Sequence, residues 1–391
     1  MRLVAAIRRA WRILAAAPRW YLATAGRRRR RGGSTTHVLF CLCDHYEPGT
    51  GGVSAAIARD RVTDLLERYP PLADKHCDSH GQRPGRTWFF PPHYHVDGAL
   101  KRLVDLCARG YGEIELHLHH GKHTPDTAEN LRQTIAQCVE EYAQFGIFGH
   151  VDGTPTYGFI HGDWAFANSR GNRFCGVDDE IDVLRETGCY ADFTFPSDNE
   201  ANPRHINALY YAKYDAGRTR SFDSGTDVRV GGADPGGLML VQGPMFPYFK
   251  EGKVLGLRIL TDVIDGAIPV TDERVDAWVR SGICVQGRED WVVVKTHTHG
   301  ATDASAVLGD EMDRIFTRLE AKYNDGVDYC LHYVTARELY NIIKAAEAGV
   351  PGADPAQYRD FLVARPRYDP SPQIDEASPQ LQELIAKTYR G

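Results

Sequence analysis

The sequence lacks the long apolar runs of membrane-spanning helices. No stretch of about 18 or more consecutive apolar residues occurs, so we expect no transmembrane helix. It also lacks any Cys-x-x-Cys pair, although it contains nine cysteines. Scattered cysteines, several of them within apolar runs, are typical of free buried thiols rather than of a disulfide framework. We therefore expect a reducing compartment and no zinc site built from thiolates.

Acidic residues are absent from the N-terminal segment. Residues 1–31 contain ten arginines, and the first carboxylate is Asp44. With those ten set aside, the other 36 basic residues face 52 acidic ones, a net charge of −16. Binding to nucleic-acid phosphates requires a basic surface, so this acidic body argues against a nucleic-acid partner.

The basic segment has an amphipathic pattern over residues 2–16. At 100° per residue one face is apolar and the other carries arginines (apolar Leu3, Val4, Ile7, Trp11 and Leu14; basic Arg2, Arg8, Arg9 and Arg12). Three alternatives fit this arm of residues 1–36: a helix on an anionic membrane surface, a helix docked on the acidic body, or a disordered basic arm. The first alternative predicts a cytoplasmic protein that is peripheral at the inner membrane.

From residue 37 the sequence alternates between β-type apolar runs and helical patterns. The predicted strands are His37–Cys43, Thr87–Phe90, Glu113–His119, Tyr157–His161, Cys189–Phe195, Leu238–Gln242, Trp291–His297 and Tyr329–Val334. The predicted helices are Ala55–Arg68, Gly98–Ala108, Ala128–Phe145, Asp179–Glu186, Asp272–Arg280, Ser305–Tyr323 and Ala336–Glu347. This alternation predicts an α/β fold, a distorted (β/α)7–8 barrel over residues 37–348. Residues 200–235 form an insertion or long loop, and residues 349–391 a Pro-rich tail with a helical pattern over 380–387.

Histidine and aspartate recur where the predicted strands end. In a βα barrel the active site lies at the carboxyl ends of the strands, so these side chains are expected to meet there. Their segments are Asp44–Glu47, His93–His95, His117–His120, His161–Trp164, Asp192 and His297–His299. One such histidine is usually a hydrogen-bonded core residue, but six strand ends of this kind predict a metal site.

The order of these segments resembles the five motifs of the polysaccharide deacetylase superfamily. The second motif, Glu-Ile-x-x-His-x-x-His, matches at every spacing through Glu113, His117 and His120. The Asp-Asp pair of the first motif corresponds to Asp44-His45, so a histidine replaces the usual metal-binding aspartate. The resemblance implies a metal-dependent deacetylase on a distorted barrel, with an exopolysaccharide-associated role.

The remaining three motifs correspond less closely. The groove-lining Arg-x-Pro-Tyr element falls at His161-Gly162-Asp163-Trp164, without its Arg and Pro. The aspartate of the fourth motif falls at Asp192, and the Leu-x-His element becomes Lys295–His299. The resemblance thus implies that His161, Asp163 and Trp164 contact substrate, with Trp164 able to stack on a sugar ring.

The residue types allow a mechanism to be written. Removing an acetyl group needs a Lewis acid, an activated water and a proton donor. We assign one divalent ion, zinc in the first instance and otherwise cobalt or iron, to His117, to His119 or His120, and to Asp44 or His45. His119 shares a face with His117 if the strand continues, and His120 does so if a helical turn begins after Leu118. Whichever of Asp44 and His45 is left over activates the water, His297 or His299 protonates the leaving group, and Asp192 holds that imidazole.

Three rival functions are consistent with parts of this pattern. A glycoside hydrolase would use two carboxylates such as Asp163 and Asp192. A binuclear amidohydrolase would begin at His93-x-His95, but its bridging lysine and last-strand aspartate are not found. A catalytically silent relative would bind glycan without turnover. We expect a carbohydrate-directed hydrolase, and turnover separates it from the silent relative.

Overall fold

A computed structural model describes residues 34–93, 96, 98–218, 220–249, 257–372 and 377–389. The amphipathic pattern of residues 2–16 and the histidine at position 95 lie outside these residues. Within them, no helix combines the length and the apolar character needed to cross a bilayer.

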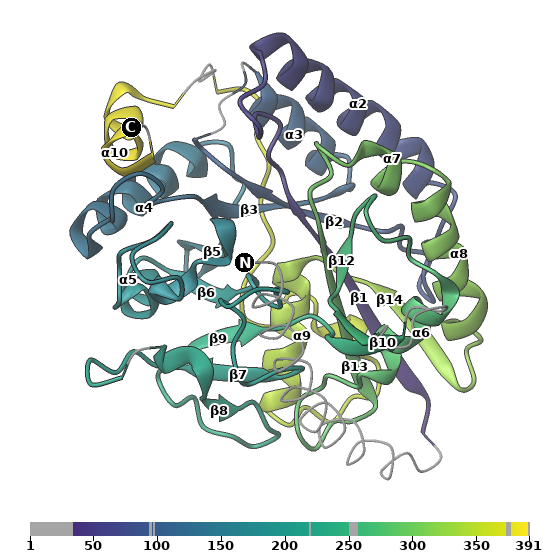
Figure 1. The fold of residues 1–391 in the computed structure, drawn as a ribbon. Helices are drawn as coiled ribbons and strands as arrows, with labels where there is room; N and C mark the ends of the chain where they lie inside the picture. The colour runs from purple at the N-terminus through teal and green to yellow at the C-terminus, as the bar shows by residue number, and fades with distance from the viewer. Residues whose placement is uncertain are drawn as a thin grey trace.

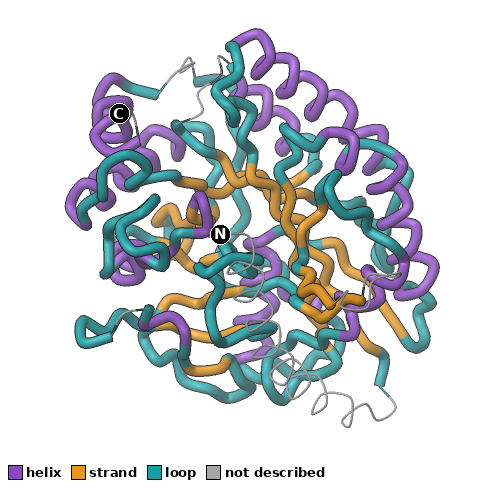
Figure 2. The backbone as a smooth tube through the Cα atoms, viewed as in Figure 1, coloured by secondary structure: helices purple, strands orange, loops and turns teal. Residues whose placement is uncertain are grey.

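The centre of the molecule is a mostly parallel sheet (Figures 1 and 2). Its strands pair in the order β12-β13-β1-β2-β3-β5-β6-β9-β7-β8. In addition, β14 pairs with β1, and β4 pairs with β5. The bounds are β1 (Thr36–His45), β2 (Arg86–Phe90), β3 (Gly112–Leu118), β4 (Gly149–Val151), β5 (Thr154–His161), β6 (Cys189–Asp192), β7 (Leu209–Ala212), β8 (Thr226–Asp227), β9 (Leu238–Val241), β12 (Val263–Ile264), β13 (Trp291–Thr298) and β14 (Tyr329–Tyr333). A separate antiparallel pair consists of β10 (Phe246–Phe249) and β11 (Leu257–Leu260).

Helices surround this sheet, with α2, α3, α4 and α8 along the periphery in Figure 1. Their bounds are α2 (Ala55–Ala73), α3 (Ala99–Ala108), α4 (Ala128–Ala143), α5 (Glu180–Glu186), α6 (Asp272–Arg280), α7 (Ala304–Val307), α8 (Asp310–Tyr323), α9 (Ala336–Glu347) and α10 (Pro379–Tyr389). Several begin at a hydroxyl cap that accepts a backbone N–H; at α9, Thr335 and Glu338 form a complete capping box. These caps fix the residue at which each of these helices begins after its loop.

The predicted elements are present, with differences at their ends. The helix expected over 305–323 is two helices, α7 and α8, which meet around Gly309. The region 200–235 is not wholly irregular, because β7 and β8 form an antiparallel extension of β9. The helical pattern over 380–387 corresponds to α10, which packs against α4.

Two apolar layers lie on opposite faces of the strands. Alternation along β1 assigns Val38, Phe40 and Leu42 to the outer layer, under the peripheral helices. Leu39, Cys41 and Cys43 belong to the inner layer, together with residues of α9. The same alternation decides to which side each polar residue at a strand end points.

The architecture is therefore mixed α/β with a mostly parallel central sheet. Among the described residues the pairing runs as a path from β12 to β8. The expectation of a closed barrel is not established by this pairing.

Candidate metal centre

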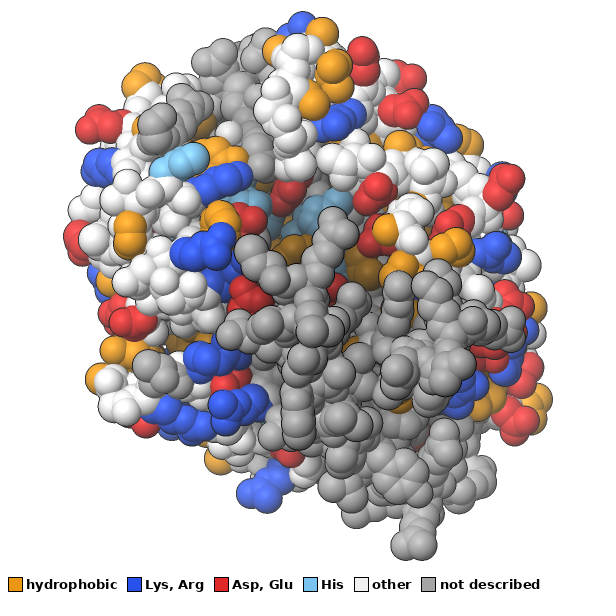
Figure 3. Space-filling view, in the orientation of Figure 1, with side chains coloured by type: hydrophobic (Ala, Val, Ile, Leu, Met, Phe, Trp, Pro, Cys, Tyr) orange, Lys and Arg blue, Asp and Glu red, His pale blue; other side chains and the backbone are white. Residues whose placement is uncertain are grey.

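Three buried side chains meet where β1 and β3 end. His45 is the last residue of β1, Glu47 follows it by two, and His117 precedes the end of β3. One ligand atom from each of the three lies within 4.8 Å of the others. Figure 3 shows histidine side chains at the bottom of a hollow, with acidic side chains at its rim. We call His45, Glu47 and His117 the inner cluster.

Glu47 is the centre of the hydrogen bonding here. Its Oε1 lies 2.7 Å from Nε2 of His117 and 2.7 Å from Nε2 of His119. Burial by itself would raise the pKa of Glu47, but His119 and His117 outweigh it and hold that pKa well below its usual range. Glu47 is thus a carboxylate that stays ionised while buried, as a metal ligand must. Glu47 was not among the ligands assigned from the sequence.

His45 carries a polar atom without a partner. Its side chain is buried, and Nε2 has no hydrogen-bond partner within the part of the chain that the structure describes. Burial lowers the pKa of His45 well below its usual range, and His299 and His117 lower it further. A neutral imidazole with an unused lone pair, beside an ionised carboxylate, fits a divalent cation. The structure places His45 beside His117, with 5.0 Å between the ring centroids.

His119 lies beside the inner cluster and is held on both sides. Its Nδ1 lies 2.9 Å from Oδ2 of Asp163, and its Nε2 faces Glu47. Burial lowers the pKa of His119, yet Glu47 and Asp163 prevail and raise it to about 10. The ring of His119 lies 4.9 Å from that of His117 between centroids, so His119 shares the face of His117, as period-two alternation requires. Asp163, expected to contact substrate, instead fixes His119.

His120 and His161 lie elsewhere, which corrects two predictions. Both face the outer layer, where their rings are 4.5 Å apart between centroids. His120 follows Leu118, an outer-layer residue, by two positions, and His161 pairs with Leu118 across β3 and β5. His120 is therefore not a partner of His117, and His161 does not line the inner cluster. A third group of possible metal ligands lies at the opposite end of β1 and consists of His37, His332 and Asp354.

His297 has a carboxylate partner that the sequence did not reveal. Nδ1 of His297 lies 2.7 Å from Oδ1 of Asp262, and Oδ2 of Asp262 accepts a hydrogen bond from Lys295 Nζ at 3.1 Å. All three side chains are buried. Asp262 precedes the two-residue strand β12, which is too short to leave a periodic signal. The ring of His297 lies 5.6 Å from that of His45 between centroids.

Asp192 does not hold this imidazole. Its Oδ2 accepts the Thr194 hydroxyl at 2.6 Å, and its Oδ1 accepts the Thr194 backbone N–H at 3.1 Å. Of the two histidines considered for that role, His297 is oriented by Asp262 and not by Asp192. Burial raises the pKa of Asp192 to about 7, against the opposing effect of the Thr194 hydrogen bonds.

The raised pKa of Asp192 predicts a pH-dependent gain in stability for Asp192→Asn. The folded pKa lies above the unfolded value, so the aspartate penalises the folded state progressively as pH rises from about 4 to 7. The asparagine carries no such penalty. Urea unfolding at pH 4 and pH 8 should show the variant gaining stability relative to the parent, by up to roughly 4 kcal/mol between the two pH values. An equal difference at both pH values would contradict this account.

Asp44 points away from the inner cluster. It is adjacent to His45 in β1, so alternation directs it to the outer layer. There Oδ2 accepts a hydrogen bond from Arg86 Nη1 at 2.9 Å, and Oδ1 accepts one from the Gly300 backbone N–H at 2.9 Å. The structure therefore does not bring Asp44 to the position expected of a water-activating base.

Trp164 and His299 complete the surroundings of the inner cluster. The ring of His299 lies 4.6 Å from His45, and that of Trp164 lies 6.0 Å from His299, between centroids. Burial lowers the pKa of His299 to about 4, so this histidine is neutral. A pocket of about 160 Å³ opens beside Trp164 and His297. Its wall combines apolar Ile259, Leu260 and Ile268 with polar Ser197, Asp198 and Thr261.

Comparison of the chain with models of known protein families and with curated proteins finds no match. The function therefore has to be argued from the geometry of these residues.

Proposed function

We propose that this protein is a metal-dependent hydrolase that removes acyl groups, acetyl in the first instance, from a carbohydrate. The observation that carries the proposal is the inner cluster of two imidazoles and one carboxylate. Two histidines and a glutamate form one of the known ligand sets of catalytic zinc, in which the fourth position is left for water or substrate. The ligands in this proposal are His45, Glu47 and His117.

The metal would supply Lewis acidity for a water and for the acyl oxygen. Zinc fits the neutral imidazoles and the ionised carboxylate, and cobalt or iron would fit as well. His119 and Asp163 hold Glu47 in position, as carboxylates and histidines around metal ligands do.

Two histidines at the edge of the inner cluster are oriented by carboxylates, and one of them can move a proton. His119 donates to Asp163 through Nδ1 and to Glu47 through Nε2, so both of its nitrogens carry protons and we assign it to positioning Glu47. His297 is oriented at Nδ1 by Asp262, and its ring borders the pocket. This leaves Nε2 of His297 to donate a proton to the departing sugar oxygen or nitrogen. The neutral His299 has no such carboxylate partner among the described residues.

The carbohydrate part of the proposal is supported by the pocket and by the order of motifs. Trp164 forms one wall, where an aromatic face can stack on a sugar ring. The pocket is small, which suits an acetyl group with part of a sugar. The resemblance to polysaccharide deacetylases and the closed barrel stay predictions, as does a membrane position of the N-terminal arm.

A glycoside hydrolase is less well supported. That chemistry needs two free carboxyl groups across the substrate. Asp163 is engaged with His119 and Asp192 with Thr194, while Glu47 and Asp262 are engaged with imidazoles. A catalytically silent relative that binds glycan would retain the metal ligands of the inner cluster. Only a measurement of turnover distinguishes it from the proposed hydrolase.

The proposal is tested by metal content and acetate release together. Plasma mass spectrometry of the purified chain should show that Glu47→Gln and His117→Ala each lose one equivalent of metal relative to the parent. Both variants should also lose acetate release from a panel of N- and O-acetylated oligosaccharides. His123→Ala, an exposed histidine close in sequence, is the control and should change neither. Unchanged metal content in both variants would sink the proposal.

A further inference from the structure

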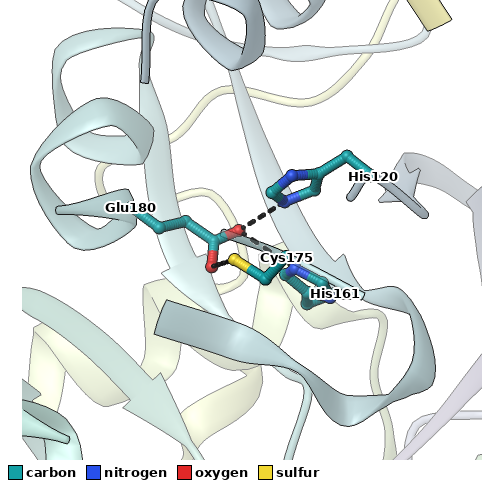
Figure 4. A group of neighbouring side chains, drawn as sticks. All are labelled: His120, His161, Cys175 and Glu180. Atoms are coloured by element: carbon teal, nitrogen blue, oxygen red, sulfur yellow. Dashed lines mark hydrogen bonds and ion pairs between the residues drawn. The ribbon is translucent and has the colours of Figure 1, made fainter. Parts of the chain in front are cut away.

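Four buried side chains converge on the other side of the strands, in the outer layer (Figure 4). They are His120 after β3, His161 at the end of β5, Cys175 in the following loop and Glu180 at the start of α5. One ligand atom from each lies within 4.8 Å of all the others. We call these four residues the outer cluster; they are at most 5% exposed.

Glu180 is the common neighbour in the outer cluster. Its Oε1 lies 3.1 Å from Nε2 of His120 and 3.5 Å from Nε2 of His161. Its Oε2 lies 3.7 Å from Sγ of Cys175 and accepts the Ala167 backbone N–H at 2.5 Å. Two imidazoles, one thiol and one carboxylate thus face a single point.

Both histidines are turned with Nδ1 outward from that point. Nδ1 of His120 lies 3.0 Å from Oδ2 of Asp126, and Nδ1 of His161 lies 2.6 Å from the carbonyl oxygen of Gly162. The carbonyl at Nδ1 of His161 fixes the tautomer that leaves its Nε2 as a lone pair, an arrangement common for metal-binding histidines. It makes Nε2 an acceptor aimed into the cluster.

A purely hydrogen-bonded network does not satisfy these atoms. Nε2 of His161 is fully buried and has no hydrogen-bond partner among the described residues, and the Glu180 oxygen 3.5 Å away is itself an acceptor. Buried acceptors that face one another are costly unless a cation or proton lies between them. A cation shared by all four ligand atoms removes this conflict.

We propose that the outer cluster is a second, structural metal site for a zinc-type divalent ion. Zinc binds thiolate at about 2.3 Å and imidazole or carboxylate at about 2.0–2.2 Å. In a tetrahedron these bonds place the ligand atoms roughly 3.3–3.8 Å apart. The contacts of 3.1–3.7 Å to Glu180 are close to that separation. Four protein ligands leave no position for substrate, so this ion would stabilise the fold rather than react.

The backbone already holds the ligands in this arrangement. The Asp126 N–H donates to the carbonyl of Cys175 at 2.7 Å, and the Phe174 N–H donates to that of Gly121 at 2.9 Å. A Cβ at Gly121, which has φ of +66°, would lie 1.8 Å from the Cys175 oxygen. Glycine is therefore required where the loop of Cys175 crosses the end of β3.

The expected role of the ion is to fasten the loop between β5 and α5. That loop contains Asp163 and Trp164, which border the inner cluster. The inference does not depend on the proposed hydrolase function, because it uses none of the inner-cluster residues.

Cobalt substitution tests the proposal on the full chain. Stripped protein titrated with Co²⁺ should develop a near-ultraviolet thiolate-to-cobalt charge-transfer band whose final intensity corresponds to one thiolate-bound cobalt per chain. Cys175→Ser should abolish the band, whereas Cys138→Ser, which alters a buried cysteine of α4, should keep it. Glu47→Gln should keep the band and lose hydrolysis, so failures of the two proposals are distinguishable. Absence of the band in the parent, or its persistence in Cys175→Ser, would overturn the site.

A second measurement covers the case in which Cys175→Ser does not fold. Zinc-loaded Glu47→Gln is suited to X-ray absorption, because its inner cluster is disabled. The spectrum should contain one sulfur scatterer at about 2.3 Å beside nitrogen and oxygen scatterers. A shell of nitrogen and oxygen alone would reject Cys175 as a ligand.

Discussion

His297→Ala should lower acetate release from an acetylated oligosaccharide by roughly 10²–10⁴-fold, the usual contribution of a general acid. The same variant should hydrolyse p-nitrophenyl acetate almost as fast as the parent. The difference arises because a sugar oxygen or nitrogen needs a proton to depart, whereas p-nitrophenolate leaves as a weakly basic anion. Rates on both substrates, with metal content measured in parallel, check this result.

Variants of three other residues test the assignment of His297 as the proton donor. His119→Gln should slow both substrates, because it disturbs Glu47, a ligand of the metal on which both reactions depend. Asp262→Asn should resemble His297→Ala and shift the pH profile, since it removes the carboxylate that orients Nδ1. Asp192→Asn should leave both rates unchanged, because Asp192 bonds to Thr194. Equal losses on both substrates in His297→Ala would contradict its role as proton donor.

The features that could be predicted from the sequence are those that follow from the alternation of apolar residues along a strand. The alternation of apolar residues places β1 and β3, and with them His45 and His117, at one edge of the sheet. Whether His119 or His120 lies on the same face as His117 depends only on where β3 ends. Because Leu118 is still extended, alternation along the strand places His119 on that face. The sorting of histidines between the two faces is thus a property of strand geometry.

Contacts between distant segments could not be predicted in this way. Asp262 reaches His297 from a segment 35 residues away, and Cys175 reaches the outer cluster from an irregular loop. Glu47 stands in a turn, where a carboxylate commonly caps the backbone, so its residue type alone does not reveal a ligand. Each of these roles depends on tertiary packing that leaves no periodic pattern in the sequence.

The ion pair between Arg86 of β2 and Asp44 of β1 also holds the loop after β13, because the Gly300 backbone N–H donates to Asp44. Both side chains are fully buried. The guanidinium also donates to the Val307 carbonyl at 3.1 Å and lies 4.2 Å from the centre of the Tyr69 ring. A Cβ at Gly300 would lie 2.3 Å from Asp44 Oδ2, so the loop passes directly over the pair.

Arg86→Met should lower the free energy of unfolding by about 3–5 kcal/mol, because it leaves the Asp44 carboxylate buried without its counter-charge. Burial already raises the pKa of Asp44 above its usual value, against the effect of Arg86. Without the guanidinium that pKa rises further, so the loss should grow as pH increases and shrink in acid, where Asp44 is protonated. The double variant Arg86→Met, Asp44→Asn should recover most of the stability in urea unfolding and retain acetate release. If the double variant folds but is inactive, Asp44 acts in the chemistry after all; if the single variant is as stable as the parent, the pair does not hold the loop.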